Sequence, residues 1–126
     1  MGQSSTTLHE DPATLSPESV DRHRAIVSLM EELEATDWYD QRVQATSDDE
    51  LRSILAHNRD EEKEHAAMLL EWLRRNDPKM AEHLKKYLYK PGPIHDAKDA
   101  GGGAPAPAAA SDRSLGIGSL RVKESA

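Results

Sequence analysis

The chain contains no cysteine and no phenylalanine, and only 4% of its 126 residues are aromatic. Without cysteine, disulfide bonds, thiolate zinc sites, iron–sulfur clusters and cysteine nucleophiles are excluded. The hydrophobic fraction is 37%, which is a small supply for a self-sufficient core. We therefore expect a second copy of the chain to complete the burial of its apolar residues.

Long hydrophobic runs are also lacking. No segment approaches the length of a membrane span, and no signal-peptide pattern leads the chain. The formal net charge of −7 argues against non-specific nucleic-acid binding and is compatible with the attraction of cations. These properties favour a cytoplasmic protein that binds neither membranes nor nucleic acid.

The first long helix has a clear start signal in the motif LSPE. Ser16 can cap the helix, and Pro17 suits the first helical position because its missing N–H has no partner there in any case. The helix should run to about Ala45.

A second long helix is predicted from about Asp48 to Arg75. In the motif TSDDE, Ser47 is the expected cap and Glu50 completes a capping box. The motif NDP ends this helix and opens a short third helix, to about Tyr89. Two long helices joined by a short turn form an antiparallel hairpin, so the expected fold class is all-α.

The composition divides the chain into four parts. The helical domain is flanked by polar residues at its start and by a linker rich in Gly, Ala and Pro at its end. Aliphatic residues then reappear as Leu115, Ile117 and Leu120. The segment that carries them is either a random tail without a role or a tethered peptide that docks on a partner. The predicted parts are a disordered segment (1–15), the helical domain (16–90), the linker (91–111) and the terminal peptide (112–126).

Each long helix carries an apolar stripe that is interrupted near its middle by a carboxylate. Residues that recur at alternating steps of three and four lie on one helix face. The interruption is Glu32 on the first helix, and Glu62 with His65 on the second. A buried, unpaired charge is costly, so these groups need a partner. The stripes are Ala25, Leu29, Glu32, Thr36, Tyr39 and Val43, and Leu51, Leu55, Asn58, Glu62, His65, Leu69 and Trp72.

Glu62 and His65 form a Glu-x-x-His pair, whose side chains leave one helix face and can converge on one point. Carboxylate and imidazole together suit iron, manganese or zinc. Di-iron carboxylate bundles use a Glu from each of two helices and a Glu-x-x-His pair from each of two others, so this chain carries half of that set. Two copies about a two-fold axis would complete a two-metal site, with Glu62 suited to bridging.

A structural alternative stays open for the same residues. A Glu at the edge of an apolar stripe often extends its carboxylate to solvent, and a single His is more often a hydrogen-bonded core residue. Three such residues on facing helices, in a known ligand spacing, favour metal binding over a plain helical interaction module.

Secondary candidates lie near Glu32 on the first helix. Glu31 and Glu34, with Trp38, form either a solvated acidic face or a weak site that collects cations for Glu32. Tyr39 is either an ordinary interface aromatic or a group that donates a hydrogen bond or reaches a metal. Other charged residues are expected to be exposed: the His57–Glu61 pair, Asp60, Glu64 and Glu71.

Three segments together resemble the encapsulated ferritins, which are two-helix ferritin-like proteins carried inside encapsulin nanocompartments. They are HRAIVSLMEELEATDWYDQRV, ILAHNRDEEKEHAAMLLEWLRRND and SLGIGSLR. The resemblance covers the three predicted helices and the terminal peptide. It implies a ferritin-like domain over residues 16–90 that dimerises into a four-helix bundle, and a ring-shaped homodecamer.

The resemblance also implies residue roles. It implies a di-iron ferroxidase centre between two subunits, with Glu32, Glu62 and His65 as iron ligands and Tyr39 at the centre. Glu31, Glu34 and Trp38 resemble an entry or secondary metal site. The terminal peptide, with Leu115, Ile117 and Leu120, resembles the cargo-loading segment that docks on the encapsulin shell.

The hypothesis that results is a ferroxidase that oxidises Fe(II) to Fe(III) and delivers iron for mineral storage inside an encapsulin nanocompartment. Two alternatives remain. One is a non-catalytic helical protein that docks on a shell partner, and the other is a ferritin-like site for another divalent metal.

Overall fold

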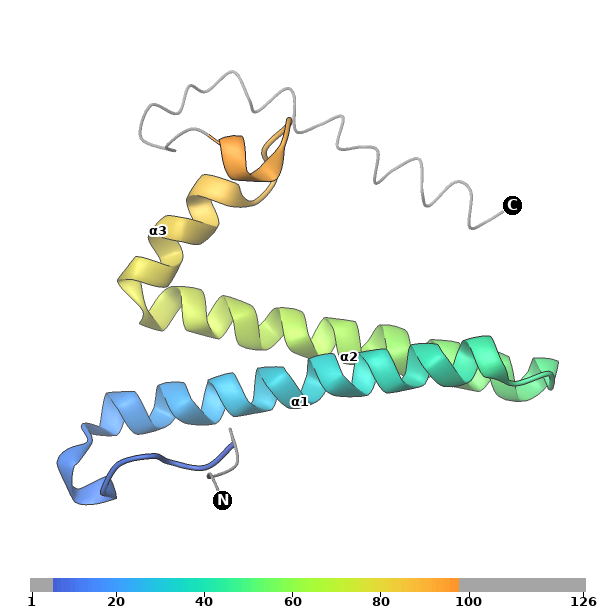
Figure 1. Cartoon of the computed structure of the whole chain (residues 1–126), viewed down its shortest axis with the longest axis horizontal. Coiled ribbons are helices and arrows are strands. Elements are labelled where there is room, and N and C mark those ends of the chain that lie inside the picture. Colours follow the sequence, from blue (N-terminus) through green and yellow to red (C-terminus); the bar gives the residue numbers. More distant parts are fainter. Residues whose placement is uncertain (1–5, 98–126) are drawn as a thin grey trace. The chain divides into compact units, whose positions relative to one another are not determined.

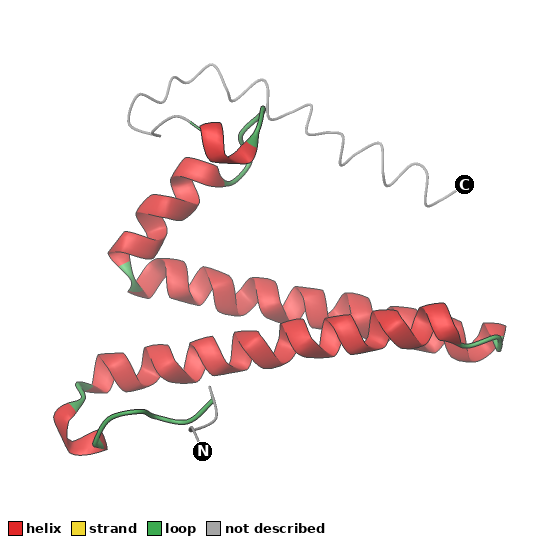
Figure 2. Ribbon diagram, viewed as in Figure 1, coloured by secondary structure: helices red, strands yellow, loops and turns green. Residues whose placement is uncertain are grey.

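The computed structural model describes residues 6–97, and every regular element in this range is helical (Figures 1 and 2). The predicted all-α class is therefore confirmed. The terminal aliphatic residues Leu115, Ile117 and Leu120 lie outside the described residues. The elements are the α-helices α1 (Pro17–Ala45), α2 (Asp49–Asn76) and α3 (Pro78–Tyr87), and the 3-10 helices η1 (Pro12–Thr14) and η2 (Ile94–Asp96).

The helices α1 and α2 form one compact unit, which ends at Asp77. They run side by side in opposite directions and are joined by a short turn, as Figure 1 shows. This is the antiparallel hairpin that the sequence predicts. The helix α3 belongs to a second unit, which begins at Pro78. None of the helices in residues 6–97 combines the length and the hydropathy needed to span a bilayer.

The start of α1 is as predicted, whereas the cap of α2 is not. Ser16 Oγ accepts a hydrogen bond from the Ser19 N–H at 3.1 Å, and Pro17 is the first helical residue. At α2 the cap is Asp48, whose carboxylate accepts from the Leu51 N–H at 2.8 Å. The predicted Ser47 cap and its capping box are therefore wrong. A carboxylate at this position satisfies a free N–H and also faces the positive end of the helix dipole.

The ends of the described segment also differ in detail from expectation. A single 3-10 turn, Pro12–Thr14, forms within the stretch that the sequence predicts to be disordered, and Asp11 caps it by accepting from the Ala13 N–H at 3.0 Å. The helix α3 ends at Tyr87, two residues earlier than predicted. Tyr89 has φ = 60°, a left-handed conformation that is incompatible with a continuing helix.

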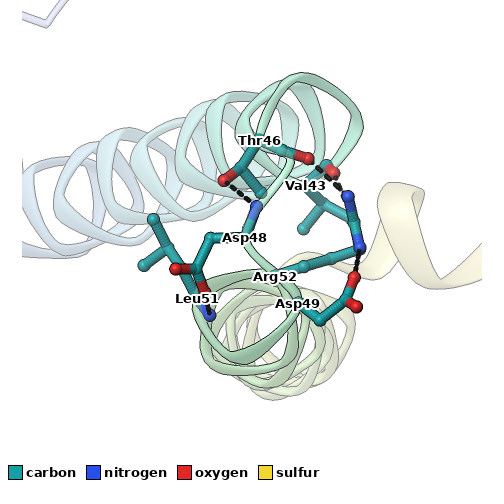
Figure 3. Close-up of polar contacts among 6 residues, drawn as sticks. All are labelled: Val43, Thr46, Asp48, Asp49, Leu51 and Arg52. Atoms are coloured by element: carbon teal, nitrogen blue, oxygen red, sulfur yellow. Dashed lines mark hydrogen bonds and ion pairs between the residues drawn. The ribbon is translucent and has the colours of Figure 1, made fainter.

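An arginine closes the hairpin at the turn (Figure 3). Arg52 of α2 donates from Nη2 to the carbonyl of Thr46, and from Nε to the carbonyl of Val43 at 3.4 Å. At the other end of the hairpin, Arg22 of α1 donates from Nη1 to the carbonyl of Asn76 at 3.5 Å. The last carbonyls of a helix lack intrahelical donors and carry the negative end of its dipole. Each long helix thus has its C-terminus met by a guanidinium from the other helix.

The core of the hairpin is thin. The buried residues are Ala25, Val43, Ala66 and Leu73. Trp72, which the sequence predicts to face the core, is 38% exposed, whereas Leu73 is 2% exposed. One hairpin covers only one face of each helix, so the apolar residues beside that face stay exposed. On α1 and α2 the large ones are Ile26, Met30, Leu33, Trp38, Leu51, Ile54, Met68 and Trp72.

Candidate metal centre

The structure brings Glu32, Glu62 and His65 together. Each offers one ligand atom, and these atoms all lie within 4.8 Å of one another. His65 Nδ1 lies 3.0 Å from Glu62 Oε1 and 3.6 Å from Glu32 Oε1. Among residues 6–97, this is the one group of at least three acidic or imidazole side chains close enough to share a metal ion.

Helical periodicity and the hairpin register together place the three side chains. Glu62 and His65 are one turn apart on α2, so they leave the same face of that helix. Glu32 lies near the middle of α1, and the antiparallel pairing puts it opposite them. Thr36 Oγ1 donates to the Glu32 carbonyl at 2.8 Å, so this hydroxyl is used within α1 and is not directed at the cluster.

The cluster is only partly buried within one chain. The side chains of Glu62, Glu32 and His65 are 21%, 27% and 43% exposed. No polar residue of the described part is fully buried. The sequence-based expectation, that a metal and a second subunit complete the burial of these groups, stays a prediction. Their exposed sides lie open to solvent or to another subunit.

The three groups shift one another's pKa values. A hydrogen bond with Glu62 raises the pKa of Glu32 above 4.5, and the same bond lowers the pKa of Glu62. The Glu62 carboxylate accepts from His65 and raises the pKa of that imidazole above 6.5. The ligand oxygens of Glu32 and Glu62 lie within 4.8 Å of each other, so the two carboxylates repel each other when both are ionised. Because the pKa of Glu32 is raised and that of Glu62 is lowered, Glu32 takes up a proton more readily.

This donor set fits a divalent transition metal. Two carboxylates and an imidazole suit iron, manganese or zinc, and no thiolate competes for a softer ion. A cation among the three groups would offset the repulsion between the two carboxylates. Three ligands from one chain leave coordination positions open for further groups.

The predicted secondary residues do not join the cluster. Glu31, Glu34 and Trp38 are exposed on α1, and Trp38 keeps 49% of its surface accessible. Tyr39 is half-buried, and the guanidinium of Arg42 lies 5.5 Å from the centre of its ring. An entry role for the first three and a role at the centre for Tyr39 stay predictions.

The sequence-based interpretation missed an ion pair between α1 and α2, that of Arg59 with Asp40. Arg59 donates from Nη1 to Asp40 Oδ1 at 2.8 Å and from Nε to Asp60 Oδ1 at 3.0 Å. The hydrogen bond from Arg59 is the main cause that lowers the pKa of Asp60. The helical spacing shows that Arg59 shares a face with Glu62, but nothing in the sequence identifies Asp40 as its partner.

Other charges behave as the sequence suggests, except that Glu71, like Asp60, has arginine partners. The expected exposed pair of His57 and Glu61 is confirmed, with Nε2 and Oε2 separated by 3.7 Å. Glu71, predicted to be simply solvated, accepts from Arg74 Nε at 2.7 Å and from Arg75 Nε at 2.6 Å. These bonds lower its pKa from 4.5 to about 2, with Arg74 contributing most.

Comparison with known proteins places this hairpin in a family. A family model described as EncFtn-like matches residues 7–91. The "Encapsulated ferritin-like protein" of Rhodospirillum rubrum is 61% identical over 129 residues, covering 96% of this chain and 92% of that protein. The "Encapsulin nanocompartment cargo protein EncC" of Myxococcus xanthus is 36% identical over 104 residues, covering 75% of this chain and 80% of that protein.

A solved structure agrees with these matches. The crystal structure of a Nitrosomonas europaea protein superposes with a TM-score of 0.67 and is 62% identical in sequence, covering 69% of this chain and 96% of that one. The helical hairpin, the family model over most of the chain and the 61% identical relative agree with one another. The chain therefore belongs to the EncFtn-like family of encapsulated ferritin-like proteins.

Proposed function

We propose that the chain is a ferroxidase, which binds Fe(II) as its substrate at Glu32, Glu62 and His65 and releases Fe(III). The observation that carries this proposal is the convergence of the three ligand atoms within 4.8 Å. The name of the relative from Rhodospirillum rubrum, an encapsulated ferritin-like protein, supports a role in iron handling.

The complete site needs two chains. One hairpin supplies three donors on a partly exposed face, and its large apolar residues, Met68 and Trp72 among them, are exposed beside that face. Two copies about a two-fold axis would supply six donors for two iron ions, each held by Glu32, Glu62 and His65, with Glu62 bridging. We extend this proposal to the ring-shaped homodecamer that the family resemblance implies.

A paired site suits the redox step. Each of two Fe(II) ions gives up one electron, so dioxygen can receive two electrons together and no one-electron product is released. The carboxylates of Glu32 and Glu62 stabilise the higher charge of Fe(III), whereas the neutral imidazole of His65 limits how tightly the product is held. Iron binds the deprotonated forms of Glu32, Glu62 and His65, so protons compete with iron at these groups.

The residues outside the cluster receive supporting roles. The exposed carboxylates of Glu31 and Glu34, with Trp38, collect cations on α1 and deliver them toward Glu32. Tyr39 lies two turns from Glu32 on the same helix and contributes a phenol group at the interface between subunits. Other divalent metals can take the place of iron at the same donors.

The protein is proposed to work inside an encapsulin nanocompartment in the cytoplasm. The relative from Myxococcus xanthus is named as an encapsulin cargo protein, and the match to the relative from Rhodospirillum rubrum covers 96% of this chain. We assign shell docking to the terminal peptide through Leu115, Ile117 and Leu120. Iron oxidised at the hairpin is then stored as mineral by the compartment.

Aerobic oxidation of Fe(II), followed optically, tests the proposed activity. Wild-type protein should oxidise Fe(II) faster than the same iron in buffer, and Glu62→Gln should fall to the buffer rate. Glu71→Gln is the matched control, because it makes the same substitution on the same helix at a carboxylate already bonded to Arg74 and Arg75. Equal rates for wild type, Glu62→Gln and buffer would favour a non-catalytic docking protein or a site for another metal.

A further inference from the structure

Arg59 is a cation placed close to the proposed iron ligands. It lies one helical turn before Glu62 on α2, a spacing at which arginine and glutamate side chains commonly form an ion pair. In the structure it does not pair with Glu62. Its Nη1 donates instead to Asp40 across the hairpin at 2.8 Å, and its Nε donates to Asp60 at 3.0 Å.

The partial burial of Arg59 and Glu62 means that an ion pair between them would affect metal binding. The side chains of Arg59 and Glu62 are each 21% exposed, so neither is fully screened by water. A guanidinium bonded to the Glu62 carboxylate would occupy ligand oxygens and place a positive charge beside the incoming cation. Both effects would oppose metal binding, because an arginine remains charged at any physiological pH.

We propose that Asp40 is a positioning residue, which holds Arg59 away from Glu62 and so keeps that carboxylate available to the metal. Asp60 fixes the Nε side of the guanidinium, while Asp40 holds the Nη1 end that could otherwise turn toward Glu62. Asp40 sits two turns from Glu32 toward the hairpin turn, so it acts through Arg59 and does not touch the metal. The inference rests on the proposed metal binding by Glu32, Glu62 and His65.

Titration of the metal-free protein with Co(II), followed by calorimetry and visible absorption, tests this role. We expect Asp40→Asn to weaken Co(II) binding about five- to ten-fold, as a partly buried charged hydrogen bond would. Arg59→Gln should bind within about two-fold of wild type, since it removes the competitor. The double variant Asp40→Asn with Arg59→Gln should recover the affinity of Arg59→Gln, and Asp40→Glu, which keeps the charge, should stay close to wild type.

Asp37→Asn is the matched control for the loss of a negative charge. Asp37 is closer to Glu32 along α1 than Asp40 is, and it accepts from Gln41 at 2.9 Å. An exposed charge acting only through solvent should change Co(II) affinity by about two-fold or less. Circular dichroism of each metal-free variant verifies that the helices remain folded.

Each outcome separates the possibilities. Loss of affinity in Asp40→Asn that Arg59→Gln restores supports the positioning role. If Asp40→Asn and Arg59→Gln lose Co(II) affinity equally, the ion pair serves only to hold the two helices together. If Asp40→Asn and Asp37→Asn lose Co(II) affinity equally, the effect comes from the loss of a negative charge alone. Either result overturns the inference while leaving the proposed function intact. Failure of the wild type to bind Co(II) or Fe(II) would overturn the proposed function, and the inference with it.

Discussion

His65 Nδ1 lies 3.0 Å from Glu62 Oε1, one turn earlier on α2, and this contact makes protons and metal ions competitors for the same groups. Glu62 raises the pKa of His65 above 6.5, and it also raises the pKa of Glu32 above 4.5 through the hydrogen bond between the two carboxyl groups. The raised pKa values of His65 and Glu32 mean that protons compete more strongly with a metal for these two groups than for free side chains.

Metal binding should release more protons at about pH 6 than at about pH 8.5, because the raised pKa of His65 keeps more of its imidazole protonated at the lower pH. Calorimetric titration with Co(II) in buffers of different ionisation enthalpy counts these protons. His65→Gln should lose most of the difference between the two pH values. An unchanged difference in that variant would assign the protons to other groups.

The stability that His65 gives to the metal-free protein should likewise fall as the pH rises. A histidine whose pKa is raised by folding stabilises the folded state below its ordinary value of 6.5, and this contribution is lost as the pH rises through the raised pKa. The Tm of wild type should therefore exceed that of His65→Gln by more at about pH 6 than at about pH 8.5. Thermal melts by circular dichroism at one fixed chain concentration give the comparison, and a gap that widens with pH would contradict it.

Removal of Arg52 should weaken the turn of the hairpin. Its guanidinium donates to the carbonyls of Thr46 and Val43, which have no intrahelical donor. We expect Arg52→Met to cost about 1 kcal/mol and to lower the Tm by about 4–8 °C. Arg24→Met is the control, because the partner of Arg24 within residues 6–97 is Asp21, at an exposed position of α1, and the Tm of this variant should shift little. Equal decreases in Tm for the two variants would show that the contacts of Arg52 at the turn add no more stability than an exposed ion pair.

Glu71 should contribute stability only above the acid range. Because the bonds from Arg74 and Arg75 lower its pKa from 4.5 to about 2, its contribution is complete above pH 4.5 and is lost as the pH falls toward 2. Glu71→Gln should therefore lower the Tm slightly near neutral pH, because water screens these exposed ion pairs, and this gap should close on acidification. Melts of both proteins across that range provide the measurement, and a gap that does not depend on pH would contradict the assignment.

Local signals in the sequence predicted the parts of the fold that depend on neighbouring residues. The Ser16 cap with Pro17 marks the start of α1, and the i, i+3 spacing of Glu62 and His65 brings their side chains to one point. Ser47 and Asp48 are both good capping residues, so the sequence alone does not distinguish them, and the turn geometry selects Asp48 as the cap of α2.

Contacts between the helices could not be predicted in the same way. The pairing of Arg59 with Asp40 depends on the register of the hairpin, and the residue spacing within either helix does not determine that register. The exposure of Trp72, next to the buried Leu73, arises because a single hairpin covers one face of α2 only. Both features follow from how α1 lies on α2, which no local pattern encodes.

The most direct test of a shared two-iron site is a single-turnover experiment. Metal-free protein is mixed rapidly with increasing Fe(II) in the presence of oxygen, and the amplitude of the fast oxidation phase is recorded. We expect this amplitude to saturate at about one iron per chain, which is two per pair of chains, and to vanish in Glu62→Gln. A fast phase that persists in Glu62→Gln, or a wild type no faster than buffer, would show that Glu32, Glu62 and His65 do not form the oxidation site.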